Sequence, residues 1–526
     1  MTGLKALLLY PEFSARGFWN YKAVCHLMGA KYPASPLGLI TMAALLPVDW
    51  QLRLLDLNTA TLQDGDIDWA DLVFIGGMLP QQPGFLRLIE RVHSRGKKVV
   101  AGGPDPTSQP EVYRSADYRV LGEAECSLPP FLSDLARGAP GRTYLFDEKP
   151  DLAKSPVPRF DLLDMRSYLM IGVQCSRGCP FNCEFCDIIE LYGRPPRTKT
   201  AQQVITELDM LYRLGHRGHV DFVDDNFIGH KAKAKEILRA VKDWSAAHGH
   251  PFFFSTEASI NLADDEELMG LMGELDFRYV FVGIESADSE LLRSMHKTTN
   301  LKRNIVEDLH RIYRHGIVVN GGFILGFDGE TSNSARKVAE VVERGKMVMS
   351  MIGLLFALPN TQLTRRLSQE HRLLEDTGRV SNEVDQTTSG LNFITCRPEA
   401  EILGDFLHVL RAAYSRKNYF DRCLSLSKTL RVQSRFKPSW RRKARYATAF
   451  LKVLVKLGLR PSTSYYFWRN FLAVLLTRVS ALETVVNLMA MYLHFGPQAE
   501  FVSGEMVKRI NLLQASAPGD NHARLN

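Results

Sequence analysis

The sequence predicts an α/β protein with three parts, and three observations along its 526 residues support this. Residues 1–145 and 165–375 alternate short apolar runs with helical patterns, as parallel sheets built from βαβ units do. A proline-rich linker, residues 146–164, lies between these two stretches. From residue 376 to residue 526 the strand pattern gives way to helices that are apolar and basic in turn. We therefore expect a Rossmann-like N-terminal domain, a partial (β/α)6 barrel and a mainly helical C-terminal region.

The first domain should form a parallel sheet with glycines at its carboxyl edge. Its predicted strands and helices cover residues 5–10, 36–46 (helix), 52–56, 72–76, 85–92 (helix) and 98–102. Two of the strands end in Gly76-Gly77 and in Gly102-Gly103-Pro104, which would let a ligand approach the backbone. Any one of these glycines could equally be an ordinary turn residue. Their recurrence at two strand ends, however, favours a ligand-binding edge.

The second domain should be an open barrel. Its predicted strands are residues 170–173, 219–223, 252–256, 279–283, 320–325 and 352–358. These make about six βα units, fewer than the eight of a full barrel. In folds of this kind the chemistry lies at the carboxyl ends of the strands.

Composition describes a globular, non-secreted protein. A hydrophobic content of 45% and a charged content of 23% are typical of soluble domains. No stretch approaches the ~20 apolar residues that span a bilayer. The N-terminal apolar run is short and lacks a cleavage site, so it predicts a strand rather than a secretory signal. We expect a cytoplasmic location.

Four of the eight cysteines crowd into residues 175–186, where Cys179, Cys183 and Cys186 form C-x3-C-x2-C directly after a predicted strand. Three thiolates on one short loop can hold three irons of a cubane and leave the fourth iron open to a ligand. The alternative is a closed zinc or iron–sulfur site that also uses Cys175. Aromatic residues between the ligands and the position at a strand end favour the open cluster. We interpret the scattered Cys25, Cys126, Cys396 and Cys423 as buried small hydrophobes.

A C-x3-C-x2-C loop followed by a partial βα barrel resembles the radical S-adenosylmethionine (SAM) superfamily. The βαβ domain before it resembles the cobalamin-binding subgroup, and this resemblance covers roughly residues 1–420. Further strings resemble a subfamily that includes the hopanoid C-2 methyltransferases: residues 176–187, 192–199, 222–228, 256–258, 283–285, 322–327 and 357–361. The resemblance implies three cofactors, namely a [4Fe–4S] cluster on Cys179, Cys183 and Cys186, SAM on the open iron, and cobalamin.

The resemblance also implies a set of SAM-binding residues: Phe185, Asp224, Asn226, Glu257, Glu285, Gly322, Ile324 and Gly326. Asp224, Asp225 and Asn226 end a strand and could equally be turn and cap residues. Glu285 follows an apolar strand and needs a partner, for which the ammonium group of SAM and a nearby arginine are comparable candidates. Cys175 is expected to be a spectator.

For cobalamin, the resemblance places the corrin face against residues 16–32 and the two glycine edges. The relevant edge residues are Gly76, Gly77, Gly102, Gly103 and Pro104. The first domain lacks the Asp-x-His-x-x-Gly motif that would supply a histidine to cobalt. Its two histidines, His26 and His93, are not part of such a motif. If cobalamin binds, we infer that it binds without a histidine ligand.

Residues 422–482 contain fourteen Lys/Arg and no Asp or Glu, whereas the whole chain has a net charge of +7. Aromatic side chains such as Trp440, Tyr446 and Phe450 lie between the basic ones. This pattern predicts association with an anionic membrane surface, peripheral to the inner membrane. RNA binding and a solvated helical subdomain packed on the barrel are the alternatives, and nucleic acid is not favoured.

These observations predict a cobalamin-dependent radical SAM C-methyltransferase that acts on a membrane isoprenoid, with hopanoid C-2 methylation as the specific reaction. Its partners would be a lipid substrate and a flavodoxin- or ferredoxin-type electron donor, and no catalytic side chain is assigned. The alternatives are a radical SAM cyclase or oxidase without methyl transfer, a tRNA-modifying methylthiotransferase, and a non-catalytic protein with a closed metal site. Cys25 and Cys126 alone are too few for the second cluster that a methylthiotransferase would carry.

Overall fold

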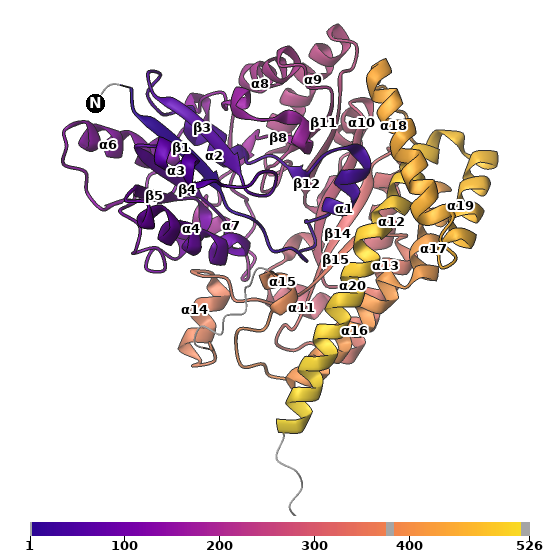
Figure 1. The fold of residues 1–526 in the computed structure, drawn as a ribbon. Helices are drawn as coiled ribbons and strands as arrows, with labels where there is room; N and C mark the ends of the chain where they lie inside the picture. Colours follow the sequence, from indigo (N-terminus) through magenta and orange to yellow (C-terminus); the bar gives the residue numbers. More distant parts are fainter. Residues whose placement is uncertain (1–2, 375–382, 517–526) are drawn as a thin grey trace, which may run out of the picture.

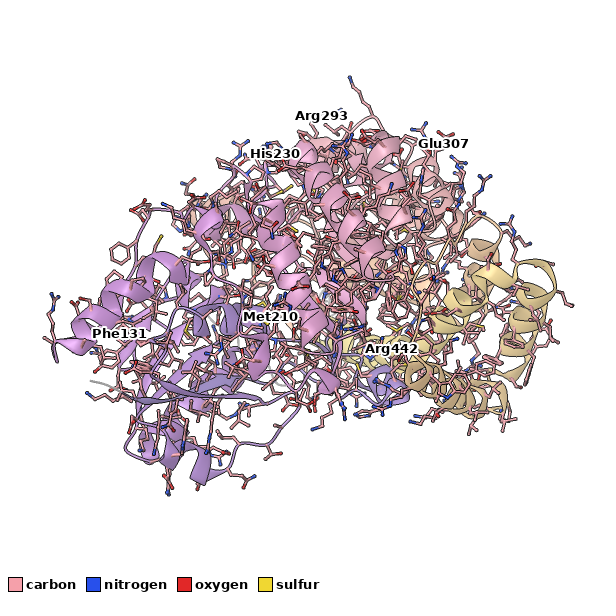
Figure 2. The ribbon with its side chains drawn as sticks, turned by 90° about the horizontal axis from the view of Figure 1, so that it is seen from above. Phe131, Met210, His230, Arg293, Glu307 and Arg442 are labelled. Carbon is pink, nitrogen blue, oxygen red and sulfur yellow. The ribbon has the colours of Figure 1, made fainter. Side chains whose placement is uncertain are left out.

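The computed structural model describes residues 3–374 and 383–516 (Figure 1). The expected boundary between residues 375 and 376 lies outside the described residues. Seen from above, the N-terminal domain around Phe131 and the C-terminal helices occupy opposite ends of the molecule, with the barrel between them (Figure 2).

The N-terminal domain is built on a six-stranded parallel sheet of order β3-β1-β4-β5-β6-β7. Its strands are β1 (Lys5–Tyr10), β3 (Gln51–Asp56), β4 (Leu72–Gly76), β5 (Lys98–Gly102), β6 (Tyr118–Val120) and β7 (Thr143–Tyr144). Its helices are α2 (Leu37–Ala43), α3 (Asp64–Trp69), α4 (Gln82–Ser94), α5 (Pro104–Ser108) and α6 (Ala124–Ala136). Alternation along β1 sends Leu7 and Leu9 to one core and Ala6 and Leu8 to another, so helices cover both faces. The predicted Rossmann-like domain is confirmed.

The barrel is a curled parallel sheet of seven strands, in the order β15-β14-β13-β12-β11-β8-β2. Six are the predicted strands: β8 (Tyr168–Val173), β11 (Gly218–Phe222), β12 (Phe252–Ala258), β13 (Phe277–Glu285), β14 (Val318–Leu325) and β15 (Ser350–Leu354). The seventh, β2 (Tyr32–Ala34), comes from the N-terminal part of the chain and pairs with β8. The structure therefore differs from the expected division at residue 145, because this strand of three residues was too short to predict and belongs to the barrel sheet.

Helices alternate with the barrel strands and cover the outer face of the sheet. They are α8 (Ala201–Arg213), α9 (Lys231–Ala247), α10 (Glu266–Glu274), α11 (Ser289–Ser294), α12 (Ile305–Arg314) and α13 (Ser332–Arg344). Thr200 begins α8 with a capping box, in which its hydroxyl accepts a hydrogen bond from the Gln203 amide at 3.2 Å. The loop after β8 carries a short antiparallel ribbon, β9 (Ser176–Arg177) with β10 (Arg197–Thr198), and the helix α7 (Ile188–Leu191).

The C-terminal region is helical, as predicted. It contains α14 (Gln362–Gln369), α15 (Gln386–Ser389), α16 (Glu399–Tyr414), α17 (Arg416–Ser427), α18 (Trp440–Val453), α19 (Ser464–Thr477) and α20 (Leu482–Ser516). The long helix α20 runs beside α16 and crosses the barrel end of the molecule (Figure 1). None of the helices in residues 3–374 and 383–516 is long and apolar enough to span a membrane.

Helix α20 packs against the segment that the sequence placed at the corrin face. The ring of Phe18 lies 4.8 Å from that of Phe495, and His494 Nε2 is 3.1 Å from the Phe18 carbonyl oxygen. The Arg16 guanidinium lies over the ring of Phe501 at 4.9 Å. The C-terminal helix thus helps to hold the segment of residues 16–32 in place, a contact that sequence patterns do not reveal, and the expectation that this segment lines a corrin stays a prediction.

At least one of the basic side chains of residues 422–482 is buried inside the protein. Arg422, at the start of that stretch, is only 1% exposed. Its Nε donates to the Met347 carbonyl at 2.8 Å, its Nη2 donates to the Ala413 carbonyl, and its Nη1 lies 3.1 Å from Glu343. Arg422 therefore fastens α17 to the end of α13, next to the barrel.

We predict that Arg422→Met lowers Tm by about 4–10 °C. Hydrogen bonds to a charged group contribute about 1.5–3 kcal/mol, and the two carbonyls would be left buried without a donor. Thermal unfolding followed by circular dichroism measures this change. Lys417→Met, on the exposed face of the same helix, is the matched control and should shift Tm by at most about 1 °C. Equal shifts for the two variants would contradict this role of Arg422.

Candidate functional site

The cysteine loop begins where β8 ends, and the end of β11 holds it in place. The Asp224 carboxylate accepts hydrogen bonds from the Cys175 amide at 3.2 Å and from the amide and hydroxyl of Ser176. The Asp225 carboxylate accepts the Gly178 amide at 2.8 Å. Gly178 has φ +94°, and a side chain there would meet the Gly193 carbonyl at 2.8 Å. The loop can close in this way only with glycine at 178.

Cys179, Cys183 and Cys186 lie on one turn of this loop as free thiols. Cys183 is buried, and Cys179 and Cys186 are partly exposed. The Cys186 amide donates to the Cys183 carbonyl at 3.2 Å, and Asn226 Nδ2 lies 3.8 Å from Cys179 Sγ. Across the described ranges, no three His, Cys, Asp or Glu side chains are grouped to hold a single metal ion.

Cys175 lies apart from these three. Its side chain is 2% exposed and belongs to the barrel core, and its carbonyl accepts the Lys199 amide at 2.8 Å. Burial and the nearby Asp224 carboxylate raise the pKa of the Cys175 thiol well above its usual range. Among the scattered cysteines, Cys25 and Cys423 are buried as expected, Cys126 is partly exposed, and the prediction was wrong for Cys396, which is exposed.

The end of β13 carries a strained ionic pair. Glu285 has φ +65°, an unfavourable value for a residue with a side chain, and the strand register shifts between Gly283 and Glu285. Glu285 Oε1 accepts a hydrogen bond from Lys297 Nζ at 3.0 Å, and both side chains are largely buried. The partner that the sequence left open is therefore a lysine rather than an arginine. Lys297 lies in a loop after α11 and carried no sequence signal.

The other predicted SAM-binding residues lie at neighbouring strand ends. A side chain at Gly322 would meet the Phe281 ring at 2.8 Å, so this position needs glycine. Gly326 has φ +106°, and its amide donates to Glu330. The Phe185 ring packs edge-to-face on Phe327 at 5.6 Å, and Ile324 is partly buried against the barrel core. The Asp224 carboxylate is occupied by the cysteine loop, a contact between residues distant in sequence.

Glu257 faces a large internal cavity of about 1150 Å³. The cavity lies inside the barrel, between the strands, residues 18–28 and helices α18 and α20. The Glu257 side chain is exposed to this space. Burial, followed by repulsion from Asp221, raises the pKa of Glu257 to about 8.

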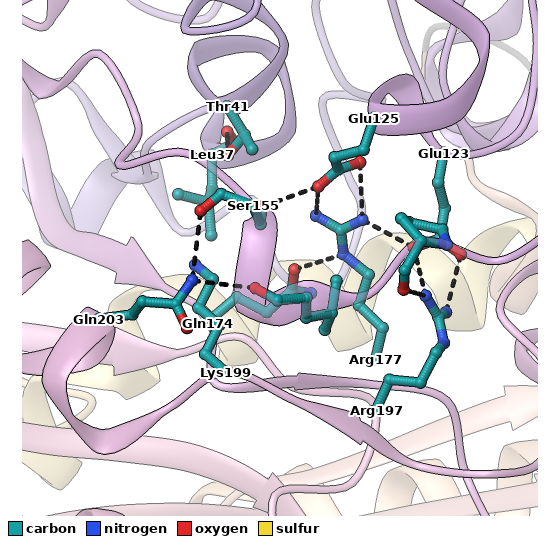
Figure 3. Close-up of polar contacts among 12 residues, drawn as sticks. Leu37, Thr41, Glu123, Glu125, Ser155, Gln174, Arg177, Arg197, Lys199 and Gln203 are labelled. Carbon is teal, nitrogen blue, oxygen red and sulfur yellow. Dashed lines mark hydrogen bonds and ion pairs between the residues drawn. The ribbon is translucent and has the colours of Figure 1, made fainter.

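The N-terminal domain is fastened to the cysteine loop by buried ion pairs (Figure 3). Arg177 lies 2.7 Å from Glu123 and 2.9 Å from Glu125, while Arg197 lies 2.7 Å from Glu123. Burial opposes ionisation, but the hydrogen bonds and charge of Arg177 hold the pKa of Glu125 below its usual range. Asn360, after β15, adds a hydrogen bond to the Ser108 carbonyl at 2.8 Å. These contacts turn the carboxyl edges of the two sheets toward each other.

The predicted glycine edge lies in this region, and the chain itself explains most of its glycines. A side chain at Gly103 would meet the Gly77 carbonyl at 2.8 Å, and one at Gly102 would meet the Val120 carbonyl at 2.8 Å. A side chain at Gly77 would meet the Phe85 ring at 2.9 Å, whereas Gly76 has only Leu39 at 3.4 Å. Pro104 begins α5 directly after the edge. At this edge of the sheet the glycines therefore present backbone atoms that no side chain of their own covers.

Neither histidine of the first domain lies at this edge. His93 pairs with Asp117 at 2.8 Å, and Asp117 also accepts the Val99 amide at the amino end of β5. The carbonyl of His26 accepts a hydrogen bond from Lys452 of α18 at 3.3 Å, on the far side of the barrel sheet.

Comparisons with known proteins agree with this geometry. Residues 173–342 match the model of the radical SAM superfamily, and residues 361–507 match a domain of unknown function. An uncharacterised methyltransferase of Synechocystis sp. is 38% identical over 96% of this chain and 94% of its own length. The hopanoid C-2 methylase of Rhodopseudomonas palustris is 36% identical over 72% of this chain and 73% of its own. The radical SAM methyltransferase TsrM of Kitasatospora setae, solved with cobalamin and a [4Fe–4S] cluster, superposes with a TM-score of 0.61 at 16% identity, over 85% of this chain and 99% of TsrM.

We predict that the stability of the protein falls as pH rises from about 5 to 8, and that Glu257→Gln reduces this fall. Because the pKa of Glu257 is raised above its unfolded value of 4.5, its stabilising contribution is complete below that value. The contribution is lost as pH rises toward 8. Tm measured at several pH values tests this, with the surface variant Glu236→Gln as control. Parallel profiles for all three proteins would contradict the prediction.

Proposed function

The chain belongs to the radical SAM family of methyltransferases that includes hopanoid C-2 methylase, and from this premise we propose that it methylates an unactivated carbon of a membrane isoprenoid. A hopanoid is the proposed substrate and its C-2 the proposed carbon. The observation that supports the proposal is the cysteine loop, which carries three free thiols on one short segment while the side chain of a fourth cysteine, Cys175, lies in the core.

Cys179, Cys183 and Cys186 would hold a [4Fe–4S] cluster. The donor set fits because three free thiols lie on one loop, while the side chain of Cys175 is enclosed by the core. One iron would then remain open for SAM. When bound, the cluster and SAM supply a radical that takes hydrogen from an unactivated carbon, and cobalamin supplies a carrier for the methyl group.

The chain's own residues would position these groups. Asn226 Nδ2 points at Cys179 Sγ and can donate to a sulfur ligand of the cluster. Glu285 and Lys297 offer opposite charges for the amino and carboxylate groups of SAM, and Gly322, without a side chain, lets the Phe281 ring pack against its backbone. Phe185, Glu257, Ile324 and Gly326 complete the set proposed around SAM, and Asp224 would act through the cysteine loop that it holds.

Cobalamin would bind between the facing carboxyl edges of the two sheets. Ligands of parallel α/β sheets bind at this edge, and here it presents the bare backbone of Gly76, Gly77, Gly102 and Gly103 before Pro104. With His26 and His93 elsewhere, cobalt would have no histidine from this domain.

We further propose that α18 and α19 lie on an anionic membrane, peripheral to the cytoplasmic face. Ten large apolar side chains between residues 440 and 479 are exposed, among them Trp440 at 83% and Leu476 at 81%. Exposed basic side chains lie between them: Arg441, Lys443, Arg445, Lys452, Lys456 and Arg460. We call these exposed residues the α18–α19 patch. An RNA would satisfy the charge but leave the aliphatic side chains in water, so a lipid surface fits better.

The function is tested with SAM that carries a deuterated methyl group. Reconstituted protein, a flavodoxin-type reductant, cobalamin and bacterial isoprenoid lipids should give 5′-deoxyadenosine and a lipid with the heavy methyl group, detected by mass spectrometry. Cys183→Ala should abolish both products, whereas Cys175→Ala, the matched control on the same loop, should keep at least half of the activity. Deoxyadenosine without label in any lipid would reject methyl transfer and favour a cyclase or oxidase.

We predict that vesicles containing phosphatidylglycerol bind the protein and that neutral vesicles bind it weakly. Lys443→Glu should weaken anionic binding roughly 10- to 30-fold, because each charge near the surface contributes about 1 kcal/mol. Lys233→Glu, exposed on α9, is the control. Co-sedimentation measures both variants, and equal binding to the two vesicle types would contradict the proposed surface.

A further inference from the structure

The large cavity opens at the opposite end of the barrel from the cysteine loop. The barrel strands line it, mainly with their amino-terminal halves, and α18 and α20 border it on the side away from the cysteine loop. Its volume of about 1150 Å³ exceeds the ~300–1,000 Å³ of sites for drug-sized ligands. Its outermost lining residues are exposed, among them Arg166, Leu214, Arg441 and Arg445.

One wall of the cavity is a polar column on β11 and β12. Alternation along β11 buries Val220 and Phe222 in the core and turns His219 and Asp221 into the cavity. The Ser255 hydroxyl donates to Asp221 and lies 2.7 Å from His219 Nε2.

The polar column continues beyond these hydrogen-bonded groups. Glu257 extends it toward the carboxyl ends of the strands. Across the cavity, Asn320 Oδ1 is buried and has no hydrogen-bond partner among the described residues. Buried polar atoms are rarely left unpaired, so a ligand with hydrogen-bonding capacity would complete this wall.

Much of the remaining lining consists of apolar side chains from the C-terminal helices and the N-terminal segment. It includes Leu27, Ala449, Phe450, Leu482, Val486 and Met491. At the upper end the Trp19 ring packs against Phe281 at 5.4 Å, and Phe281 in turn covers Gly322. The cavity therefore reaches from the C-terminal helices to the layer directly below the strand ends proposed to hold SAM.

Burial favours the neutral forms of the titratable groups in the polar column at neutral pH. Burial lowers the pKa of His219 to about 3 and raises that of Glu257 to about 8, so both side chains are neutral there. A hydroxyl or carbonyl group of a ligand would find both donors and acceptors along this column, and arginine side chains such as Arg278 also line the cavity.

We propose that this cavity is the substrate chamber and takes a large, mostly apolar lipid that carries a hydrogen-bonding oxygen. The oxygen lies against the His219–Ser255–Asp221 column, and the apolar body lies against α18 and α20. This inference rests on the proposed function and names the site and chemical class of its substrate.

The lipid enters at the amino ends of the barrel strands, beside α18. Figure 2 places Arg442, one of the lining residues, where the C-terminal helices meet the barrel. The outer face of the same helix carries the α18–α19 patch, so a lipid passes from the bilayer into the chamber along apolar surface. The cofactors occupy the other end of the barrel, and the two routes do not compete.

A photoactivatable pentacyclic triterpene alcohol and the matched hydrocarbon without the hydroxyl test the chamber. Both probes carry a diazirine and are bound to the reconstituted full chain without reductant, so that no turnover is needed. We expect cross-links on α18, α20 and residues 18–28, mapped by mass spectrometry. Ala449→Trp, which fills the apolar wall, should reduce labelling at least tenfold, whereas Ala444→Trp, exposed on the same helix, should not.

The polar column is tested by Ser255→Ala. It should weaken binding of the alcohol roughly 2- to 10-fold, the effect of one net hydrogen bond, and leave binding of the hydrocarbon unchanged. Cross-links confined to the loops around the cysteines, absent labelling, or unchanged labelling of Ala449→Trp would overturn the chamber. Methylated lipid with cross-links elsewhere would reject the chamber alone, and chamber labelling without methyl transfer would reject the function alone.

Discussion

The buried ion pairs between Arg177, Arg197 and the glutamates of the N-terminal domain set the geometry on which the remaining site depends. Arg177 lies within the cysteine loop, two residues before Cys179, and its side chain is 10% exposed. Bringing these charges out of water costs free energy, and leaving one of them unpaired would cost more. The N-terminal sheet is thereby held in one orientation over the loop, with its carboxyl edge toward that of the barrel. A cofactor on the sheet and a cluster on the loop would face the same space.

The molecule uses the two ends of its barrel for different tasks. Polar strand ends, the Glu285–Lys297 pair and the cysteine loop meet at the carboxyl end. At the amino end the cavity is bordered by α18 and α20, which line it with many apolar side chains, and the outer face of α18 is apolar and basic. The net positive charge of the C-terminal stretch thus has two roles, since Arg422 is enclosed and anchors α17 while the basic residues of α18 remain on the surface.

Sequence patterns predicted most of the fold because buried parallel strands are continuous apolar runs separated by helical periods. They predicted the cysteine loop because its three cysteines lie close together in the sequence, at a recognisable spacing. They missed β2, which has three residues and pairs with a strand more than a hundred residues away. They also missed Lys297, the position of residues 16–32 against α20 and the occupation of Asp224 by the cysteine loop, since these depend on contacts distant in sequence.

The central claim is that three cysteines hold a cluster with one iron open to SAM, and electron paramagnetic resonance of the reduced cluster tests it most directly. Adding SAM should change the spectrum, because its amino and carboxylate groups would become ligands of the open iron. Cys183→Ala should lose the signal. A spectrum that is the same with and without SAM, or a cluster that survives in Cys183→Ala, would contradict the account.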